Sequence, residues 1–102
     1  MKLWIDDVRA PDGNDWGWCK SVNEAKHLIC VWHYQMFIDI DVIDIDHDAG
    51  DYAKDGGDYI KLLDWLEWAG LSYPIHIHSM NVVGRMNMEA IIQRNGWKEV
   101  FY

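Results

Sequence analysis

The chain of 102 residues holds 17 acidic and 9 basic side chains, which leaves a formal net charge of −8 at pH 7, and half of its residues are hydrophobic. This charge argues against binding to a nucleic-acid duplex, because duplex binding depends on many contacts from Lys and Arg to phosphates. The length fits a single domain with one hydrophobic core, and we expect residues 1–102 to form it.

The two cysteines and the charged start of the chain bear on its location. Cys19 and Cys30 lack CxxC spacing, which argues against a zinc ribbon or a disulfide scaffold. Lys2, Asp6 and Asp7 interrupt any apolar leader, and no run approaches the ~18 apolar residues that a membrane span needs. We therefore expect a cytoplasmic protein with no membrane partner.

The first part of the chain predicts two strands and a helix. Residues 2–5 form a short apolar run, and residues 9–15 predict a loop because they are rich in Pro, Gly and Asx. Residues 16–20 predict a second strand in spite of a central glycine. Ser21 and Glu24 have the spacing of a capping box, which predicts that a helix begins there.

The middle of the chain predicts another strand, a loop, a helix and a fourth strand. Residues 42–46 predict the strand, and the Asp- and Gly-rich residues 47–57 predict the loop. Apolar residues then follow helical spacing over 59–69, up to a glycine. The fourth predicted strand, 75–79, begins directly after a proline.

A third helix that ends near residues 95–96 and a last strand at 97–102 complete the expected order. Strands that alternate with helices predict an α/β fold with a mostly parallel sheet. We expect a small three-layer sandwich in which helices cover both faces of five strands. A parallel crossover usually needs a dozen or more residues, so we expect the first crossover to be shortened.

Acidic and imidazole side chains follow the predicted strands directly. Asp6 and Asp7 follow the first strand, Asp46 and His47 the third, and His78 ends the fourth. Ligands of open α/β sheets bind at the carboxyl ends of the strands, where these side chains are expected to meet. Three aspartates at one place repel each other, and a hard divalent cation relieves that repulsion. The sequence therefore predicts that Asp6, Asp7 and Asp46 bind Mg²⁺ or Mn²⁺.

Three segments resemble response-regulator receiver domains: Lys2–Asp7, Asp44–Asp46 and the hydroxyl of Ser79. The resemblance implies that the acidic pair and Asp46 bind Mg²⁺, that Asp46 accepts a phosphoryl group and that Ser79 senses it. The chain departs from that family at Lys98. Receivers place a lysine at the end of the fifth strand, whereas Lys98 lies near the start of the last predicted strand.

A narrower set of motifs is similar to the cyclic-phosphate processing receiver domain family. The segments are Leu3–Arg9, Ile45–Asp48 with Gly50, Ile75–Ser79 and Asn81–Glu89. They occur in order and span nearly the whole chain. The resemblance implies a receiver-like, flavodoxin-like fold and a reaction on a cyclic phosphate, such as a 2′,3′-cyclic nucleotide or an RNA end.

Opening a cyclic phosphodiester requires an activated water, protonation of the leaving oxygen and neutralisation of charge on the phosphate. Histidine suits the first two tasks, and we expect His47 and His78 to act as general base and general acid, in either order. His76, deeper in its strand, is expected to be a hydrogen-bonded core residue. Guanidinium, hydroxyl and amide groups suit the phosphate. The expected phosphate-binding residues are Arg9, Ser79, Asn81 and Arg85.

Other interpretations stay open at this stage. Arg85 is one helical turn from Glu89 and can pair with it instead. Trp16 and Trp18 are more often sheet-face aromatics than base-stacking residues, so we leave them out of the site. The alternatives to a metal-dependent phosphoesterase are a phosphoacceptor receiver that uses Asp46 and a non-catalytic module that binds or signals through a protein partner.

Overall fold

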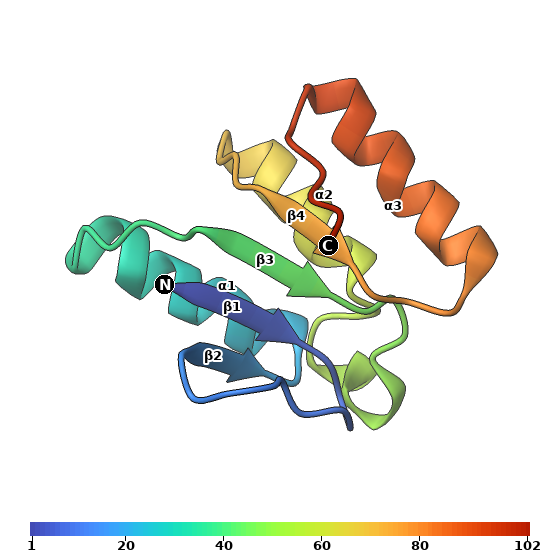
Figure 1. Ribbon diagram of the computed structural model, residues 1–102, viewed down its shortest axis with the longest axis horizontal. Helices are drawn as coiled ribbons and strands as arrows, with labels where there is room; N and C mark the ends of the chain where they lie inside the picture. Colours follow the sequence, from blue (N-terminus) through green and yellow to red (C-terminus); the bar gives the residue numbers. More distant parts are fainter.

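The computed structural model describes residues 1–102 as an α/β fold with one parallel sheet. Its strands are β1 (Lys2–Ile5), β2 (Trp16–Cys19), β3 (Val42–Ile45) and β4 (Ile75–Ile77), in the order β2-β1-β3-β4 (Figure 1). Each neighbouring pair of strands is parallel. The receiver-like α/β class expected from the sequence is confirmed.

Three α-helices follow strands two, three and four: α1 (Val22–Cys30), α2 (Ile60–Ala69) and α3 (Val82–Asn95). α1 continues directly into a π-helix, η1 (Val31–Gln35). The loop predicted before α2 contains a 3₁₀-helix, η2 (Gly50–Asp55). None of the helices combines the length and the apolar character that crossing a membrane requires.

The handedness of the connections decides which face of the sheet each segment covers. From β1 to β2 the chain moves one way across the sheet, and from β2 to β3 and on to β4 it moves the other way. Because parallel crossovers are right-handed, connections that run in opposite directions lie on opposite faces. The loop between β1 and β2 is thus separated from all three helices.

One hydrophobic core lies between the sheet and the helices. Alternate strand residues enter it, since side chains of a strand point in turn to its two faces. The strand residues of this core are Leu3, Ile5, Cys19, Ile43, Ile45, Ile75 and Ile77. Each of the three helices contributes an apolar stripe, made up of Val22, Ala25, Ile29, Leu62, Leu63, Leu66, Met88, Ile91 and Ile92.

The second face of the sheet is covered by loop and tail rather than by helices. Trp4 points to this face, and its indole N–H donates to the Arg9 carbonyl at 2.6 Å. The Tyr102 hydroxyl donates to Asp44 on the same face. The last residues pass in front of β4 in Figure 1, whereas α1 and α2 lie behind the sheet. The expected three-layer sandwich is therefore wrong in one respect: the first crossover is short, as predicted, but no helix covers the second face.

The last predicted strand, 97–102, forms only a single bridge. Glu99 pairs in parallel with Ile75, and the Val100 amide donates to the Ile75 carbonyl at 2.7 Å. The next acceptor of the ladder, the Val100 carbonyl, instead contacts Nδ1 of His76 at 2.7 Å. A side chain thus takes the place of a backbone partner, which accounts for four strands instead of five. His76 is hydrogen-bonded, as expected from its place in the strand.

Gly17 explains why a glycine occupies the middle of β2. A Cβ atom at Gly17 would lie 2.7 Å from Cη2 of Trp32 and 3.1 Å from Cδ2 of Leu28. We predict that Gly17→Ala destabilises the fold by about 1–3 kcal/mol, because it overpacks the contact between β2 and η1. Urea denaturation measures the loss. In a Trp32→Phe background the same change should cost less; an equal cost in both backgrounds would contradict the packing explanation.

Candidate metal and phosphate site

A polar pocket of about 280 Å³ lies at the carboxyl ends of β1, β3 and β4. This is the point between β1 and β3 where the chain reverses its direction across the sheet, the usual ligand site of such folds. The pocket brings together six of the residues expected in the site. They are Asp6, Arg9, Asp46, His78, Ser79 and Asn81.

Asp6 is buried and held in one orientation. Its Oδ1 accepts hydrogen bonds from the backbone amides of Val8 at 3.0 Å and Arg9 at 2.9 Å. Burial acts to raise the pKa of Asp6, but these two amides and His78 together lower it below its ordinary value. Asp6 therefore presents an ionised carboxylate to the pocket, as a metal ligand must.

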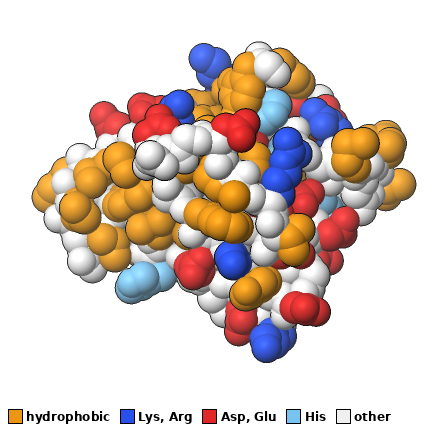
Figure 2. All heavy atoms as spheres, turned by 60° about the horizontal axis from the view of Figure 1, so that its bottom comes forward, with side chains coloured by type: hydrophobic (Ala, Val, Ile, Leu, Met, Phe, Trp, Pro, Cys, Tyr) orange, Lys and Arg blue, Asp and Glu red, His pale blue; other side chains and the backbone are white.

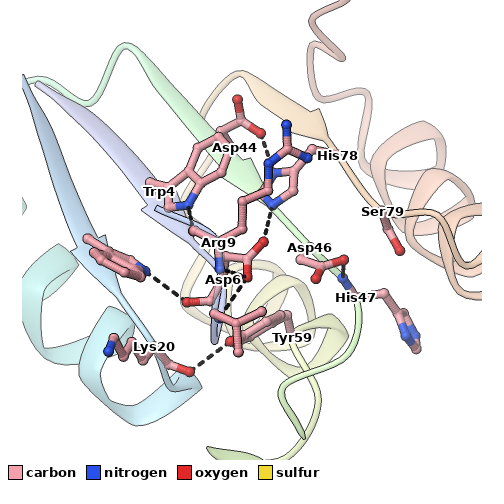
Figure 3. Close-up of polar contacts among 12 residues, drawn as sticks. Trp4, Asp6, Arg9, Lys20, Asp44, Asp46, His47, Tyr59, His78 and Ser79 are labelled. Carbon is pink, nitrogen blue, oxygen red and sulfur yellow. Dashed lines mark hydrogen bonds and ion pairs between the residues drawn. The ribbon is translucent and has the colours of Figure 1, made fainter. Parts of the chain in front are cut away.

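His78 lies between two buried carboxylates (Figure 3). Its Nε2 is 2.9 Å from Oδ2 of Asp6, and its Nδ1 is 2.6 Å from Oδ1 of Asp44. The imidazole also stacks on Trp4, with ring centroids 4.2 Å apart and planes 5° from parallel. The two carboxylates thus hold the ring within its plane, and the stacking on Trp4 holds it against movement perpendicular to that plane.

The contacts of His78 determine its charge. A neutral imidazole donates from one nitrogen only, so two carboxylate acceptors call for the imidazolium form. Burial acts to lower the pKa of His78, but the hydrogen bonds to Asp44 and Asp6 outweigh it, and the pKa lies above its ordinary value. The two contacts therefore favour the imidazolium form of His78.

Asp44 is a site residue that we did not predict. It lies inside β3 and its side chain is only 2% exposed, so it requires a partner for its charge. His78 supplies one, and the Tyr102 hydroxyl donates to its second oxygen. An ionised residue in the middle of an otherwise apolar strand was the signal in the sequence.

Asp46 completes a cluster that fits a divalent cation. One ligand atom each from Asp6, Asp46 and His78 lies within 4.8 Å of the others. Carboxylate oxygens suit Mg²⁺ and Mn²⁺, whereas an imidazole nitrogen is a softer ligand. Oδ1 of Asp46 accepts from the His47 amide at 2.8 Å, which orients the carboxylate. The donor set fits a metal ion, and it does not decide which one.

Asp7, predicted as a third metal ligand, lies outside this cluster. Its carboxylate packs against Gly50, where an added Cβ would lie 2.5 Å from Oδ2 of Asp7. Burial, together with the nearby charges of Asp6 and Asp46, raises the pKa of Asp7. Of the three aspartates predicted to bind the metal, Asp6 and Asp46 belong to the cluster, beside His78, and Asp7 does not.

His47 does not share the pocket with His78. Its Nδ1 contacts Oδ1 of Asp48 at 2.9 Å, and its ring packs against Gly84, where an added Cβ would lie 2.4 Å from the ring. Figure 3 shows the ring directed away from His78. The two histidines follow adjacent strands, as expected, but they do not flank one space.

The remaining predicted residues differ in their distance from the pocket. Oγ of Ser79 accepts from the Asn81 amide at 3.0 Å, and Asn81 caps α3 through the Gly84 amide at 2.9 Å. Arg85 does not line the pocket: its Nε lies 3.5 Å from Glu89, the pairing that we left open.

Arg9 is the only Lys or Arg side chain that lines the pocket. It is exposed, and its guanidinium carbon lies 5.9 Å from the ring centroid of Trp4. A cationic side chain beside an acidic metal pocket is suited to an anionic ligand. Arg9 therefore remains the best candidate for direct contact with a phosphate.

We predict that the stabilising effect of His78 depends on pH. Because its folded pKa is raised, its contribution is complete below the unfolded value near ~6.5 and is lost as the pH rises through the folded value. In urea denaturation with a metal chelator, the stability difference between wild type and His78→Gln should shrink as the pH rises above neutral. His27→Gln, on the exposed side of α1, is the control; a difference that grows with pH would contradict the charged state.

Comparison with known proteins places the chain. The family model described as the cyclic-phosphate processing receiver domain matches residues 1–94. No curated protein and no solved structure gives a significant match. The family match covers the whole sheet, all three α-helices except the last residue of α3, and every pocket residue named above. The chain therefore belongs to the cyclic-phosphate processing receiver domain family.

Proposed function

We propose that the protein is a metal-dependent phosphoesterase that opens a cyclic phosphate, such as a 2′,3′-cyclic nucleotide. The observation that carries the proposal is the convergence of Asp6, Asp46 and His78 in one pocket of a chain from this family. The pocket offers both a cation site and a protonated imidazole. When water opens the ring of a cyclic phosphodiester, a cation can offset charge on the phosphate and an acid can protonate the leaving oxygen.

Asp6 and Asp46 would hold the metal, either Mg²⁺ or Mn²⁺. When bound, such an ion polarises the phosphate oxygens and makes water a better nucleophile. Arg9 would contact the phosphate from the loop after β1, where its guanidinium can offset a second negative charge. No lysine or arginine forms an ion pair with Asp6 or Asp46, so a cation between them would also relieve their mutual repulsion.

His78 would act as the general acid. In the imidazolium form it would carry a proton at Nε2, while Asp44 orients the ring and favours that form through Nδ1. As water adds to phosphorus, the bond from phosphorus to one ring oxygen breaks, and the Nε2 proton passes to that oxygen. The product is a phosphomonoester with a free hydroxyl, and a proton from the attacking water restores the imidazolium.

The phosphoacceptor alternative lacks its usual cation. The Lys98 carbonyl accepts from the Ile75 amide, so Lys98 lies beside the amino end of β4, at the opposite end of the strand from Asp46. At the carboxyl end the corresponding segment places Tyr102 against His76. This arrangement argues against a stable acyl phosphate on Asp46, which receivers neutralise with a lysine.

A non-catalytic binding module is the second candidate. Apolar side chains are exposed around the start of α3, and Figure 2 shows hydrophobic groups at this end of the molecule and at the opposite end. These exposed side chains are Met80, Val82, Val83 and Met86, of which Met80 also lines the pocket. Exposed apolar patches of this kind are common at protein contacts. This candidate predicts no turnover, so the same assay separates it from the enzyme.

The first test is hydrolysis of 2′,3′-cyclic nucleotides with Mg²⁺ or Mn²⁺, followed by chromatography of the products. We expect metal-dependent formation of a 2′- or 3′-monophosphate. Asp46→Asn should abolish it, because one metal-ligating charge is lost. Asp51→Asn, an exposed aspartate of η2, is the control and should behave as wild type. No turnover of any cyclic phosphate, or full activity in Asp46→Asn, would reject the proposal.

The second test separates an acid from a metal ligand at His78. We predict that His78→Gln lowers kcat by roughly 10²–10⁴-fold, the usual contribution of a general acid, and leaves the affinity for Mn²⁺ unchanged. Calorimetry measures the affinity. A matching loss of Mn²⁺ affinity would make His78 a ligand instead. His47→Gln should keep most of the activity, and an equal loss there would reinstate the pair of histidines expected from the sequence.

A further inference from the structure

A second recess, of about 240 Å³, lies on the face of the sheet that has no helix. It opens between the loop after β1 and the last residue of the chain. Its walls come from β1, β2, β3 and these two segments. The lining residues that matter here are Trp4, Arg9, Asp12, Trp16, Asp44 and Tyr102. The proposed reaction uses Arg9 and Asp44 but places no part of the ligand in the recess itself.

Arg9 connects the recess with the metal and phosphate pocket, because it lines both. Asp44 lines the recess as well, and it holds the imidazole of His78, which lines the pocket. A phosphate in contact with Arg9 would therefore have its organic part within reach of the second recess. The recess and the metal pocket are therefore neighbours that share Arg9.

Aromatic rings form the walls of the recess. Trp4 and Trp16 meet edge to face, with centroids 5.6 Å apart and planes at 75°. Their indole N–H groups are already satisfied: Trp4 donates to the Arg9 carbonyl at 2.6 Å, and Trp16 donates to the Asp12 carbonyl at 3.0 Å. The loop thus fixes both rings. Trp4 is buried and stacks on His78, so the half-buried Trp16 is the indole with surface left for a ligand, and it has no unpaired donor.

Charged groups lie around these rings. Lys2 places its ammonium 5.1 Å from the ring centroid of Trp16, and Arg9 lies over Trp4. The Asp12 side chain belongs to the lining and lies on the exposed loop, where its carboxylate can accept hydrogen bonds. The Lys2 ammonium is paired with Asp15 at 3.2 Å, so Arg9 is the cation left to face a phosphate. The Asp12 carboxylate suits an amino or hydroxyl group of a ligand.

We propose that this recess binds the nucleobase of a nucleotide whose cyclic phosphate occupies the metal pocket. The inference rests on the proposed function and narrows its substrate class to nucleoside cyclic phosphates, in preference to cyclic phosphates of simple polyols. Stacking on aromatic side chains is tolerant of base identity, since every base has a π-face. The recess thus selects for a base and discriminates little among bases.

The test compares two probes in the presence of Mn²⁺: adenosine 3′-monophosphate and glycerol 2-phosphate, which lacks a base. Wild type should bind the nucleotide more tightly. Trp16→Ala should weaken nucleotide binding by roughly 5- to 150-fold, the range for loss of one stacked base, and should leave glycerol phosphate unaffected. Trp68→Ala, whose exposed indole lies on α2, is the matched control and should change neither affinity.

A second readout does not depend on the fold of a variant. In ¹H–¹⁵N NMR of the wild-type protein, adenosine 3′-monophosphate should shift the indole signals of Trp4 and Trp16 and leave that of Trp68 in place. Equal affinity for the two probes, or indole signals that do not move, would overturn the proposal that the recess binds the base. Nucleotide binding that depends on Trp16 but is followed by no hydrolysis would reject the proposed phosphoesterase activity. It would still support base binding in the recess.

A third arm distinguishes a free nucleotide from the end of an RNA strand. An oligoribonucleotide with a 3′-terminal phosphate should show the same dependence on Trp16, because only its last nucleoside enters the recess. Weaker binding than the mononucleotide would identify a free nucleotide as the ligand, since the net charge of −8 repels the remaining phosphates. If Trp16→Ala binds the oligoribonucleotide as tightly as wild type does, the proposal that the recess binds its last base is wrong.

Discussion

The right-handedness of parallel connections is the constraint on which this structure depends. Because the chain crosses the sheet in opposite directions before and after β2, the helices and the loop after β1 must lie on opposite faces. At the same reversal the connections that leave β1 and β3 go to opposite faces of the sheet, which leaves a crevice between these strand ends. Asp6 and Asp46 directly follow the two strands there. Topology thus produces both the core and the position of the pocket. It also leaves aromatic side chains of β1 and β2 on a face without a helix.

Charge balance within the pocket links the fold to its chemistry. Asp6, Asp44 and Asp46 are three carboxylates, and His78 contacts two of them, Asp6 and Asp44, through its two ring nitrogens. Removing one partner from a buried ion pair typically costs about 3–5 kcal/mol, because the other charge is left uncompensated. The carboxylates of this group outnumber its one imidazole, and a divalent cation would offset the remaining negative charge.

Strand-end residues could be predicted from the sequence, whereas side-chain direction and the second face could not. Asp6, Asp46 and His78 follow apolar strands, so their common edge follows from the alternation of strands and helices. The position of His47 depends on the direction in which the chain leaves β3, which no periodicity reports. Asp44 lies inside a strand, and its role depends on the register between β3 and β4, which the local sequence pattern does not report. The missing fifth strand and third layer likewise reflect tertiary contacts rather than local pattern.

The central claim is that a divalent cation binds between Asp6 and Asp46 beside His78. Anomalous diffraction from crystals grown with Mn²⁺ tests it most directly, because the signal locates the ion without reference to the protein atoms. The account predicts one strong peak within bonding distance of a carboxylate oxygen from each aspartate. A peak at Asp7 and Gly50, or no ordered ion in this pocket at saturating Mn²⁺, would contradict it.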